Sequence, residues 1–586
     1  MILQSLVAYY EALADKGKIA RPGWERVKVT HALEIDSEGQ LLSILPLKTE
    51  SKDGKRMVPR EMELPARVKK TVGISSNFLC ENAAYFLGIG DKEKPQRVLD
   101  CFAAAKQLHQ EILSELDNDY AKAICLFFNT WDASQARENE LILPYIEELE
   151  GSVNLIFYFQ NHYPLEEKEI KAAWQKYYDQ DETGDKMPCL ITGESRVPAA
   201  THPSVKGVAG AQSSGAALVS FNAPAYCSFG REQNYNAPVS KYAAFAYTTV
   251  LNHLLSEREH VKRIGDSTLV YWSEDAEQAP QECFGAYMYG ANNTAENQDT
   301  VDDNDLDDLM GKVANGEVVN WKGSPVNPKN RFYVLSLAPN AARLSVRFFF
   351  CDSFGSMIRN IQNHYKRIEV VPDNRNTYKN IPLWALLRET VNENAREKVA
   401  SPQMSGDMLR AILTGGRYPS TLYQQTQLRI RAERTITRGR AAIIKAYLDR
   451  IDHHKEVLTV ELNEQTTYQP YVLGRLFAVL EEIQNKASGV TTIKDKYFTS
   501  ACATPSVVFP IIVSLSEKHV RKLEIGSKIN LSKKMGELMA MITNSYPVHH
   551  NLYDQGIFQL GYYHQTQKRY EKKNENQTTK EENENV

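Results

Sequence analysis

The residues best suited to metal or acid–base chemistry are an acidic run and a histidine pair. The run holds Asp302, Asp303, Asp305, Asp307 and Asp308. It does not fit a calcium loop, because counting from Asp303 position six is Asp308 instead of glycine and position twelve is Ala314 instead of glutamate. His453 and His454 would point about 100° apart on a helix, so they cannot share one ligand face. We expect no metal site, and a solvated loop at the acidic run.

Motifs for phosphate binding and nucleophilic catalysis are absent from the sequence. A P-loop requires GxxxxGK[ST], because backbone amides and a lysine must hold the phosphates together, and no segment matches it. The glycine cluster from Gly207 to Gly215 fits neither this pattern nor GxGxxG, and no GxSxG nucleophile elbow occurs. We therefore expect no catalytic residues and no cofactor. A metal-dependent DNA nuclease that uses Asp302 to Asp308, or Asp352, stays open as the alternative.

A stretch rich in glycine, hydroxyls and amides lies between Val197 and Val239 and contains one acid, Glu232. Such a strip could lie against phosphates without repulsion, while its amides pair with base edges and its rings stack on exposed bases. Turns also require Gly, Ser and Asn, so a folded loop whose amides satisfy its own backbone is the alternative. The rings are Phe221, Tyr226, Phe229 and Tyr235. The candidate contact residues are Lys206, Gln212, Ser213, Ser214, Asn222, Gln233, Asn234 and Asn236.

A second candidate is the segment from Arg67 to Phe78. Three cations come before a glycine hinge at Gly73, two hydroxyls and an amide, just ahead of a helix expected to begin near Leu79. The N-terminal amides of that helix would also favour a phosphate. A plain helix cap at Ser76 or Asn77 is the alternative. The candidate contact residues are Lys70, Ser75, Ser76 and Asn77.

The third candidate is the stretch from Arg429 to Lys445, which contains six cations and a single acid, Glu433. Four of the cations recur at helical spacing along one side of a helix predicted over 423–451, and apolar residues mostly occupy the other side. Solvated helix faces normally mix both signs, so this ridge indicates contact with nucleic acid. It consists of Arg429, Arg431, Arg434, Arg438, Arg440 and Lys445.

Hydrophobic periodicity predicts the elements that must position these residues. Alternation over 27–47 predicts strands joined by a turn at DSEG, and NLIFYFQ predicts a buried strand between helices over 92–116 and 170–178. Near Arg331 two further strands are joined by NAA and followed by a helix over 357–368. After Pro382 only helices are predicted, over 383–391, 404–413, 423–451, 471–486, 518–523 and 531–543.

These elements predict an α+β protein, with a mixed α/β N-terminal body, a loop-rich central region and a C-terminal α-helical bundle. The predicted parts are an N-terminal α/β domain (1–190), an acid-poor Gly/Ser/Asn loop region (191–240), a second α/β part (241–380), the helical bundle (381–564) and a tail (565–586). The tail contains almost no apolar residue, so we expect it to be disordered.

Composition limits the class of protein. The chain has 586 residues, a formal net charge of -4 and 42% hydrophobic residues, which exclude a collagen and a wholly disordered chain and require any basic surface to be local. The eight cysteines form no CxxC pair, which indicates reduced, mostly buried thiols in a cytoplasmic protein. Glu11 and Asp15 interrupt the apolar start, so we expect no signal peptide. The uncharged run 497–516 contains hydroxyls and prolines, and it predicts a buried helix pair broken at Pro505 or Pro510 instead of a membrane span.

Four separated segments resemble the large subunit of the type I-C CRISPR surveillance complex, Cascade. They occur in the right order over essentially the whole chain: MILQSLVAYYEALAD, VKKTVGISSNFLCENAAYFLGI, GVAGAQSSGAALVSFNAPAYCSFGREQNYNAPVSKYAAFAYTTVLNHLL and LGRLFAVLEEIQNKA. The resemblance implies a non-enzymatic subunit of an antiviral ribonucleoprotein complex, which sits near the 5' handle of the guide RNA and contacts the Cascade backbone subunits. It implies reading of a protospacer-adjacent motif (PAM) in double-stranded target DNA, strand opening and recruitment of a separate helicase-nuclease, while base pairing supplies the remaining specificity.

The resemblance also assigns roles to the candidate residues. The loop Gly73 to Asn77 is similar to a PAM-proximal loop, and the region from Lys206 to Asn236 is the second candidate for PAM contact. The helical third resembles a small subunit whose basic face would hold the displaced strand. Separately made small subunits similar to this part are implied, with Val472 as a possible start. A scaffold that contacts only protein is a further alternative.

Overall fold

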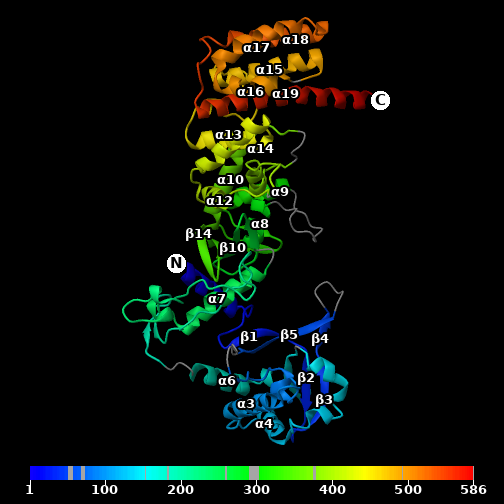
Figure 1. Ribbon diagram of the computed structural model, residues 1–586, viewed down its shortest axis with the longest axis vertical. Coiled ribbons are helices and arrows are strands. Elements are labelled where there is room, and N and C mark those ends of the chain that lie inside the picture. The colour runs from blue at the N-terminus through cyan, green and yellow to red at the C-terminus, as the bar shows by residue number, and fades with distance from the viewer. Residues whose placement is uncertain are drawn as a thin grey trace. The chain divides into compact units, whose positions relative to one another are not determined.

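The computed structural model shows two compact units, and Figure 1 traces their elements. The first unit comprises Met1–Pro203 and Val219–Val250, and the second comprises Ser204–Leu218 and Leu251–Val586. The predicted loop region therefore contributes to both units. This division does not test the five predicted parts, because those were defined by composition and secondary structure. The structure describes residues 1–50, 57–67, 73–151, 153–180, 184–257, 261–289, 303–373, 378–396, 398–490 and 492–584.

The first unit contains small sheets covered by helices. Its strands are β1 (Trp24–Val29), β2 (His31–Ile35), β3 (Leu41–Pro46), β4 (Lys48–Glu50), β5 (Met57–Pro65), β6 (Leu155–Phe159), β7 (Met187–Pro188) and β8 (Ser195–Arg196). The sheet orders are β1-β5-β4, β3-β2-β6 and β7-β8. The pairs are antiparallel except β2 with β6, which is parallel. The predicted strand–turn–strand over 31–46 is confirmed, and Asp36 closes its turn by accepting from the backbone N–H of Glu38 and Gln40 at 2.9 and 2.8 Å.

One strand prediction in this unit was wrong. The run VKVTHALEID divides after Val29 into β1 and β2, which belong to different sheets. Thr30 lies at the division, and its backbone N–H and its hydroxyl both donate to the carbonyl of Asn154, each at 3.0 Å. Alternation along the sequence cannot reveal this change of sheet, because both strands keep the same period of two.

Helices complete the first unit, and aromatic rings fill its core. The predicted helices over 92–116 and 170–178 and the predicted strand NLIFYFQ correspond to α3, α6 and β6. Phe86 stacks on Phe157 at 4.9 Å and meets Phe128 edge-on at 5.8 Å, so α2, α4 and β6 share one apolar cluster. The helices are α1 (Ile2–Asp15), α2 (Ala83–Phe86), α3 (Pro95–Leu113), α4 (Asp119–Thr130), α5 (Ile146–Leu149), α6 (Lys168–Gln180) and α7 (Lys241–Ser256), of which the residues from Leu251 onward count with the second unit.

The second unit begins with an antiparallel sheet in the order β14-β13-β10-β9. The predicted strand pair joined by NAA is confirmed, with Arg331 opposite Ser353 and Asn340 opposite Arg343. Every residue of β10 is buried, as expected for a central strand covered on both faces. The strands are β9 (Val261–Ile264), β10 (Ser267–Ser273), β11 (Val319–Trp321), β12 (Ser324–Val326), β13 (Arg331–Asn340) and β14 (Arg343–Ser353).

Helices make up most of the rest of the second unit, and among its described residues no strand follows β14. One continuous apolar cluster extends from the sheet into these helices. The helices are α8 (Ala279–Tyr289), α9 (Asp303–Ala314), α10 (Phe354–Ile368), α11 (Leu383–Arg388), α12 (Pro402–Thr414), α13 (Ser420–Glu433), α14 (Arg438–Arg450), α15 (Gln469–Ser488), α16 (Thr492–Ala503), α17 (Pro505–Val520), α18 (Ile525–Ala540) and α19 (Leu552–Glu584). The overall fold is α+β, as predicted.

Three predictions in the helical part need comment. The acidic run predicted as a loop forms helix α9 from Asp303 onward, because Leu306, Met310 and Val313 give it an apolar face that is buried in the core. The run 497–516 is two helices divided at Pro505, as predicted. Residues 565–584, predicted as disordered, continue α19, since extending an existing helix avoids the cost of nucleation.

Helices α15 and α19 approach each other closely at two glycines. A Cβ atom at Gly474 would lie 1.9 Å from the carbonyl oxygen of Phe558, and one at Gly561 would lie 2.3 Å from that of Tyr471. No side chain fits at either position without moving a backbone. The glycine in the segment LGRLFAVLE is therefore required for this helix contact.

Candidate nucleic-acid interface

The Gly73–Asn82 loop is held by two buried polar side chains. Asn77 donates from its backbone N–H and its Nδ2 to Oε1 of Glu81 at 3.1 and 2.8 Å. Leu79 has a φ of +58°, and its N–H donates to Nε2 of His109 at 3.0 Å. Nδ1 of His109 faces the carbonyl of Ala105 at 2.8 Å, so the proton lies on Nδ1 and the ring is neutral. Burial lowers the pKa of His109 to about 4, which keeps the ring neutral near pH 7.

This arrangement corrects part of the prediction for the loop. Ser76 and Asn77 are only 7% and 6% exposed, so neither side chain is presented to a groove of DNA. No helix begins near Leu79; α2 begins at Ala83, and Asn82 is its cap, accepting from the N–H of Ala84 at 3.0 Å. Ser75 is half-buried and stays a candidate contact. Lys70 lies outside the described residues.

The accessible side of the same loop faces a cavity of about 260 Å³. Ser75, Ser76 and Asn77 line it together with Trp174 and Tyr177 of α6. Any group that reaches Ser75 from this side therefore also meets aromatic side chains. The sequence analysis did not identify this cavity, because α6 lies about a hundred residues after the loop in the chain.

The first half of the acid-poor region forms an exposed turn in the second unit. Val205 and Ala216 pair as an isolated bridge, and the N–H of Gly215 donates to the carbonyl of Gln212 at 2.9 Å. Gln212, Ser213 and Ser214 are exposed at the tip, and Lys206 is exposed at the base. The backbone N–H of Lys206 donates to Oδ1 of Asn252 at 2.7 Å, which leaves the ammonium group to solvent. These four predicted residues thus share one accessible turn.

The second half of the region forms a loop of the first unit, and here the predicted residues divide. Asn222 and Gln233 are exposed. Asn234 is 2% exposed, and its N–H donates to the carbonyl of Ala200 at 3.2 Å. Asn236 accepts from the N–H of Ser228 at 2.8 Å and donates to the carbonyls of Arg231 and Gln233 at 3.0 and 2.9 Å. Neither amide is available for the predicted base contact, because the side chain of Asn234 is covered by the protein and that of Asn236 is hydrogen-bonded within the loop.

The predicted cationic ridge does not exist as one helix face. Helix α13 ends where Arg434 adopts a left-handed backbone with φ +54°, and α14 begins after the cap Thr437, whose hydroxyl accepts from the N–H of Arg440 at 3.2 Å. The break rotates the later cations away from the earlier ones. The prediction of one helix over 423–451 was therefore wrong.

Three cations of the predicted ridge are buried and bonded inside the protein. Arg440 contacts Glu433 and lies 3.4 Å from Oε2 of Glu389, with its side chain 4% exposed. Arg438 donates to the carbonyl of Lys379 at 3.4 Å. Lys445 donates to the carbonyls of Lys366 and Arg367 at 3.3 and 3.0 Å, and burial lowers its pKa. These residues stabilise the fold and cannot contact DNA in this conformation.

The other three ridge residues are more accessible. Arg431 and Arg434 are exposed; Arg431 donates to Oε1 of Gln555 at 2.9 Å, and Arg434 lies 3.9 Å from Oδ1 of Asp495. Arg429 pairs with Glu433 at 3.5 Å and is 21% exposed. Arg431 and Arg434 are thus the members of the ridge that a phosphate could reach.

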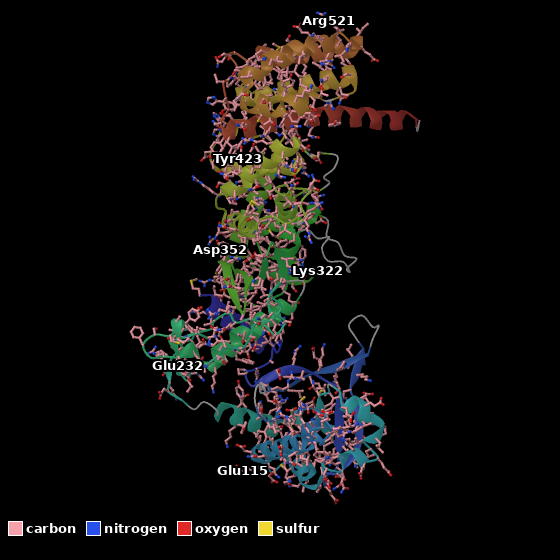
Figure 2. All side chains as sticks on the ribbon, viewed as in Figure 1. Glu115, Glu232, Lys322, Asp352, Tyr423 and Arg521 are labelled. Atoms are coloured by element: carbon pink, nitrogen blue, oxygen red, sulfur yellow. The ribbon has the colours of Figure 1, made fainter. Side chains whose placement is uncertain are left out.

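A different group of cations, which the sequence analysis missed, is exposed on α17, on α18 and in the turn between them. It consists of Lys518, Arg521, Lys522, Lys528 and Lys533. Figure 2 labels Arg521 beside α17 and α18. Among the described residues only Lys533 of this group has an ion pair, with Glu537 at 3.9 Å. The excess of cations over acids between 517 and 534 was a visible signal, but it spans two helices and follows no single helical period.

Comparison with known protein families decides the identity of the chain. Its sequence matches the family described as CRISPR-associated protein (Cas_Csd1) over residues 6–570. The chain belongs to the Csd1 family of CRISPR-associated proteins. No curated protein matches this Csd1-family chain. Family membership supports the predicted role as a large subunit of a CRISPR surveillance complex.

Two carboxylates of the alternative nuclease, Asp307 and Asp352, are hydrogen-bonded within the protein. Asp307 of α9 accepts from Nδ2 of Asn380 at 3.1 Å, and Asp352, which is labelled in Figure 2, accepts from the hydroxyl of Ser356 at 3.1 Å. Asp302 lies outside the described residues. In the described part of the Csd1-family chain, no three His, Cys, Asp or Glu side chains gather as a metal would require. Across those residues, no helix combines the length and apolar character needed to cross a bilayer.

Proposed function

We propose that this Csd1-family chain is a non-catalytic, nucleic-acid-binding large subunit of a type I-C CRISPR complex. It recognises a PAM in double-stranded target DNA, helps to open the strands, and recruits a separate helicase-nuclease that cuts. Its other partners are the guide RNA near the 5' handle, the Cascade backbone subunits and separately made small subunits similar to its own C-terminal part.

The exposed turn from Gln212 to Ser214 is the observation that carries this proposal. An amide and two hydroxyls stand together at its tip, Lys206 stands at its base, and no acid lies in the turn. Amides and hydroxyls discriminate base edges, while a lysine at the base adds attraction to a phosphate. Asn222 and Gln233, which are exposed, and Ser75, which is half-buried, are further candidates for the same task.

Displaced-strand holding is assigned to cations that solvent can reach. We assign it to Lys518, Arg521, Lys522, Lys528 and Lys533 of α17, α18 and the turn between them, together with Arg431 and Arg434. Exposed lysines and arginines bind a single strand by neutralising phosphates and releasing counterions. Glu517 and Glu524 lie in the same segment, so the attraction comes from the excess of cations and not from an acid-free surface.

The decisive experiment compares assembled complexes on two duplexes that differ only in the PAM. Gln212→Ala should reduce the difference in binding free energy between the two duplexes by about 1 to 3 kcal/mol if the amide contacts a base. Gln424→Ala, an exposed glutamine on α13, is the matched control and should leave discrimination unchanged. Equal weakening on both duplexes by Gln212→Ala would contradict base recognition by this turn.

A nuclease assay tests the non-catalytic part of the proposal. The purified chain should leave labelled DNA intact in the presence of Mg²⁺ or Mn²⁺. Fragments that disappear in Asp307→Asn or Asp352→Asn would overturn it in favour of a metal-dependent nuclease. Affinity for DNA that does not change with salt concentration would instead support a scaffold that contacts only protein.

A further inference from the structure

Phe229 is the most exposed large apolar side chain among the described residues, with 98% of its surface accessible. It lies between two short 3-10 helices, η4 (Pro224–Tyr226) and η5 (Gln233–Asn236). Its backbone is also left-handed, with φ +51°. Bulky residues rarely adopt this conformation, and a phenylalanine gains nothing from exposure to water. Two unfavourable features at one residue suggest that the ring has a binding role.

The loop that carries Phe229 is held in a defined shape. Asn236 bonds to three backbone groups around it, at Ser228, Arg231 and Gln233. The N–H of Arg231 also donates to the carbonyl of Ser228 at 3.0 Å, which closes a turn directly around the ring-bearing residue. Asn234 fixes the far end of the loop through Ala200. Phe229 is therefore presented by a supported loop and not by a loose tip.

The surroundings of the ring are polar. Every residue from Ser228 to Gln233 is exposed, and apart from Phe229 and Gly230 the side chains are a hydroxyl, a guanidinium, a carboxylate and an amide. Figure 2 marks Glu232 in this loop. A protein-docking site normally buries an aromatic anchor within an apolar patch, which these neighbours do not provide. A single exposed ring can stack on a nucleobase, and a neighbouring guanidinium can pair with the adjacent phosphate.

We propose that Phe229 stacks on a nucleobase of the bound DNA, with Arg231 on a neighbouring phosphate. This inference rests on the proposed function, because it requires that the assembled complex binds duplex DNA. Apolar side chains inserted at a base step unstack it, and stacking on a ring tolerates any base. Phe229 would therefore add affinity without adding preference for one base, in contrast to Gln212.

The test uses the assembled complex and duplexes with 2-aminopurine placed at successive positions on both sides of the PAM. The wild-type complex should change the fluorescence at one position, and Phe229→Ala should abolish that change and weaken duplex binding by roughly 5- to 150-fold. Phe229→Trp should retain both, because an indole also stacks. Leu190→Ala, which removes a 61% exposed apolar side chain from the same unit, should have no effect.

The possible failures are distinguishable. If Phe229→Ala binds duplex as tightly as wild type and keeps the fluorescence change, the stacking role is wrong while the proposed function stands. If Phe229→Ala binds DNA normally but loses affinity for another subunit or for the helicase-nuclease, the ring contacts protein and the inference is overturned. If the wild-type complex does not bind duplex DNA, the proposed function itself fails.

Discussion

Asn77 and Glu81 form a buried clamp in which one carboxylate oxygen accepts both the backbone N–H and the side-chain Nδ2 of Asn77, at 3.1 and 2.8 Å. The other carboxylate oxygen accepts from the N–H of Asn82 at 2.9 Å. A single acid thus fixes both ends of the Asn77–Asn82 turn. The amide that looked available for DNA is instead used to hold the loop.

Replacing Asn77 should therefore change stability before it changes recognition. Asn77→Ala leaves part of the buried carboxylate without a donor, and we expect a loss of about 1 to 3 kcal/mol in the free energy of unfolding. Urea denaturation of the full chain measures it. Ser75→Ala, on the accessible side of the same loop, is the control and should stay within about 0.5 kcal/mol of wild type. Equal stability of Asn77→Ala and wild type would refute the clamp.

Arg440 gives a second prediction about stability. Arg440→Met leaves Glu433 and Glu389 close together without their shared cation, and we expect a loss of about 3 to 5 kcal/mol. Arg434→Ala, whose side chain is 45% exposed, should cost less than about 1 kcal/mol. Thermal or urea unfolding compares the two variants. If Arg434→Ala lost more unfolding free energy than Arg440→Met, the ion pairs of Arg440 with Glu433 and Glu389 would not have the stabilising role described.

The exposed cations from Lys518 to Lys533, on α17, on α18 and in the turn between them, should control the salt dependence of single-strand binding. Replacing Lys522 and Lys528 with alanine removes two phosphate contacts, so the slope of log affinity against log salt should fall in magnitude by about 1.4. Lys329 and Arg410, which are exposed elsewhere in the second unit, provide a charge-matched control pair that should leave the slope unchanged. Binding of assembled complexes to a labelled single strand at several salt concentrations measures the slope. If both double variants had the same slope, the salt dependence would follow from the net charge of the chain and not from a strand bound at Lys522 and Lys528.

Buried histidines should make the protein less stable in mild acid. His109 is neutral in the folded state, with a pKa of about 4 against 6.5 in the unfolded chain. Between these values only the unfolded chain takes up the proton, so stability falls as the pH decreases from 6.5 to about 4 and then levels off. The contribution is about 1.4 kcal/mol per pH unit. His364 and His564, each with a pKa of about 3, act in the same direction.

A variant without the titrating group tests this origin. His109→Gln keeps an oxygen that can accept from the N–H of Leu79 but cannot take up a proton. We expect it to be less stable than wild type at pH 7 and to show a smaller decrease in unfolding free energy between pH 7 and pH 5. If the two proteins lose the same free energy over this range, His109 is not responsible.

The close contact of α15 and α19 predicts opposite effects of two glycine substitutions. Gly474→Ala places a methyl group against the carbonyl of Phe558 and should destabilise the second unit by about 1 to 3 kcal/mol or more, as expected for overpacking. Gly536→Ala lies within helix α18 with nothing within 4 Å and should stabilise it by up to about 1 kcal/mol. Thermal unfolding of both variants measures the sign. Stabilisation by Gly474→Ala would show that the helices are further apart than described.

The sequence by itself determined most of the helices and strands, and it also determined which segments are poor in acids. The residue pattern placed β13, β14 and α10 correctly. A nearly continuous apolar run predicted β13, which is buried on both faces, and apolar residues at helical spacing predicted α10, which buries one face against the core. The scarcity of acids between Val197 and Val239, where Glu232 is the one acid, is also a property of composition and does not depend on how the segment folds; contact of this segment with DNA stays a prediction. The long segments that resemble a known family are likewise a property of the sequence alone.

Only the tertiary structure decided which polar side chains are available to a partner. Asn77, Asn236 and Arg440 look like binding residues in the sequence, but each is bonded within the fold, and the pattern of residue types does not record such bonds. The left-handed backbone at Arg434 likewise turned one predicted cationic face into two helices. Burial and hydrogen bonding depend on segments that are far apart in the chain, so local sequence patterns cannot specify them.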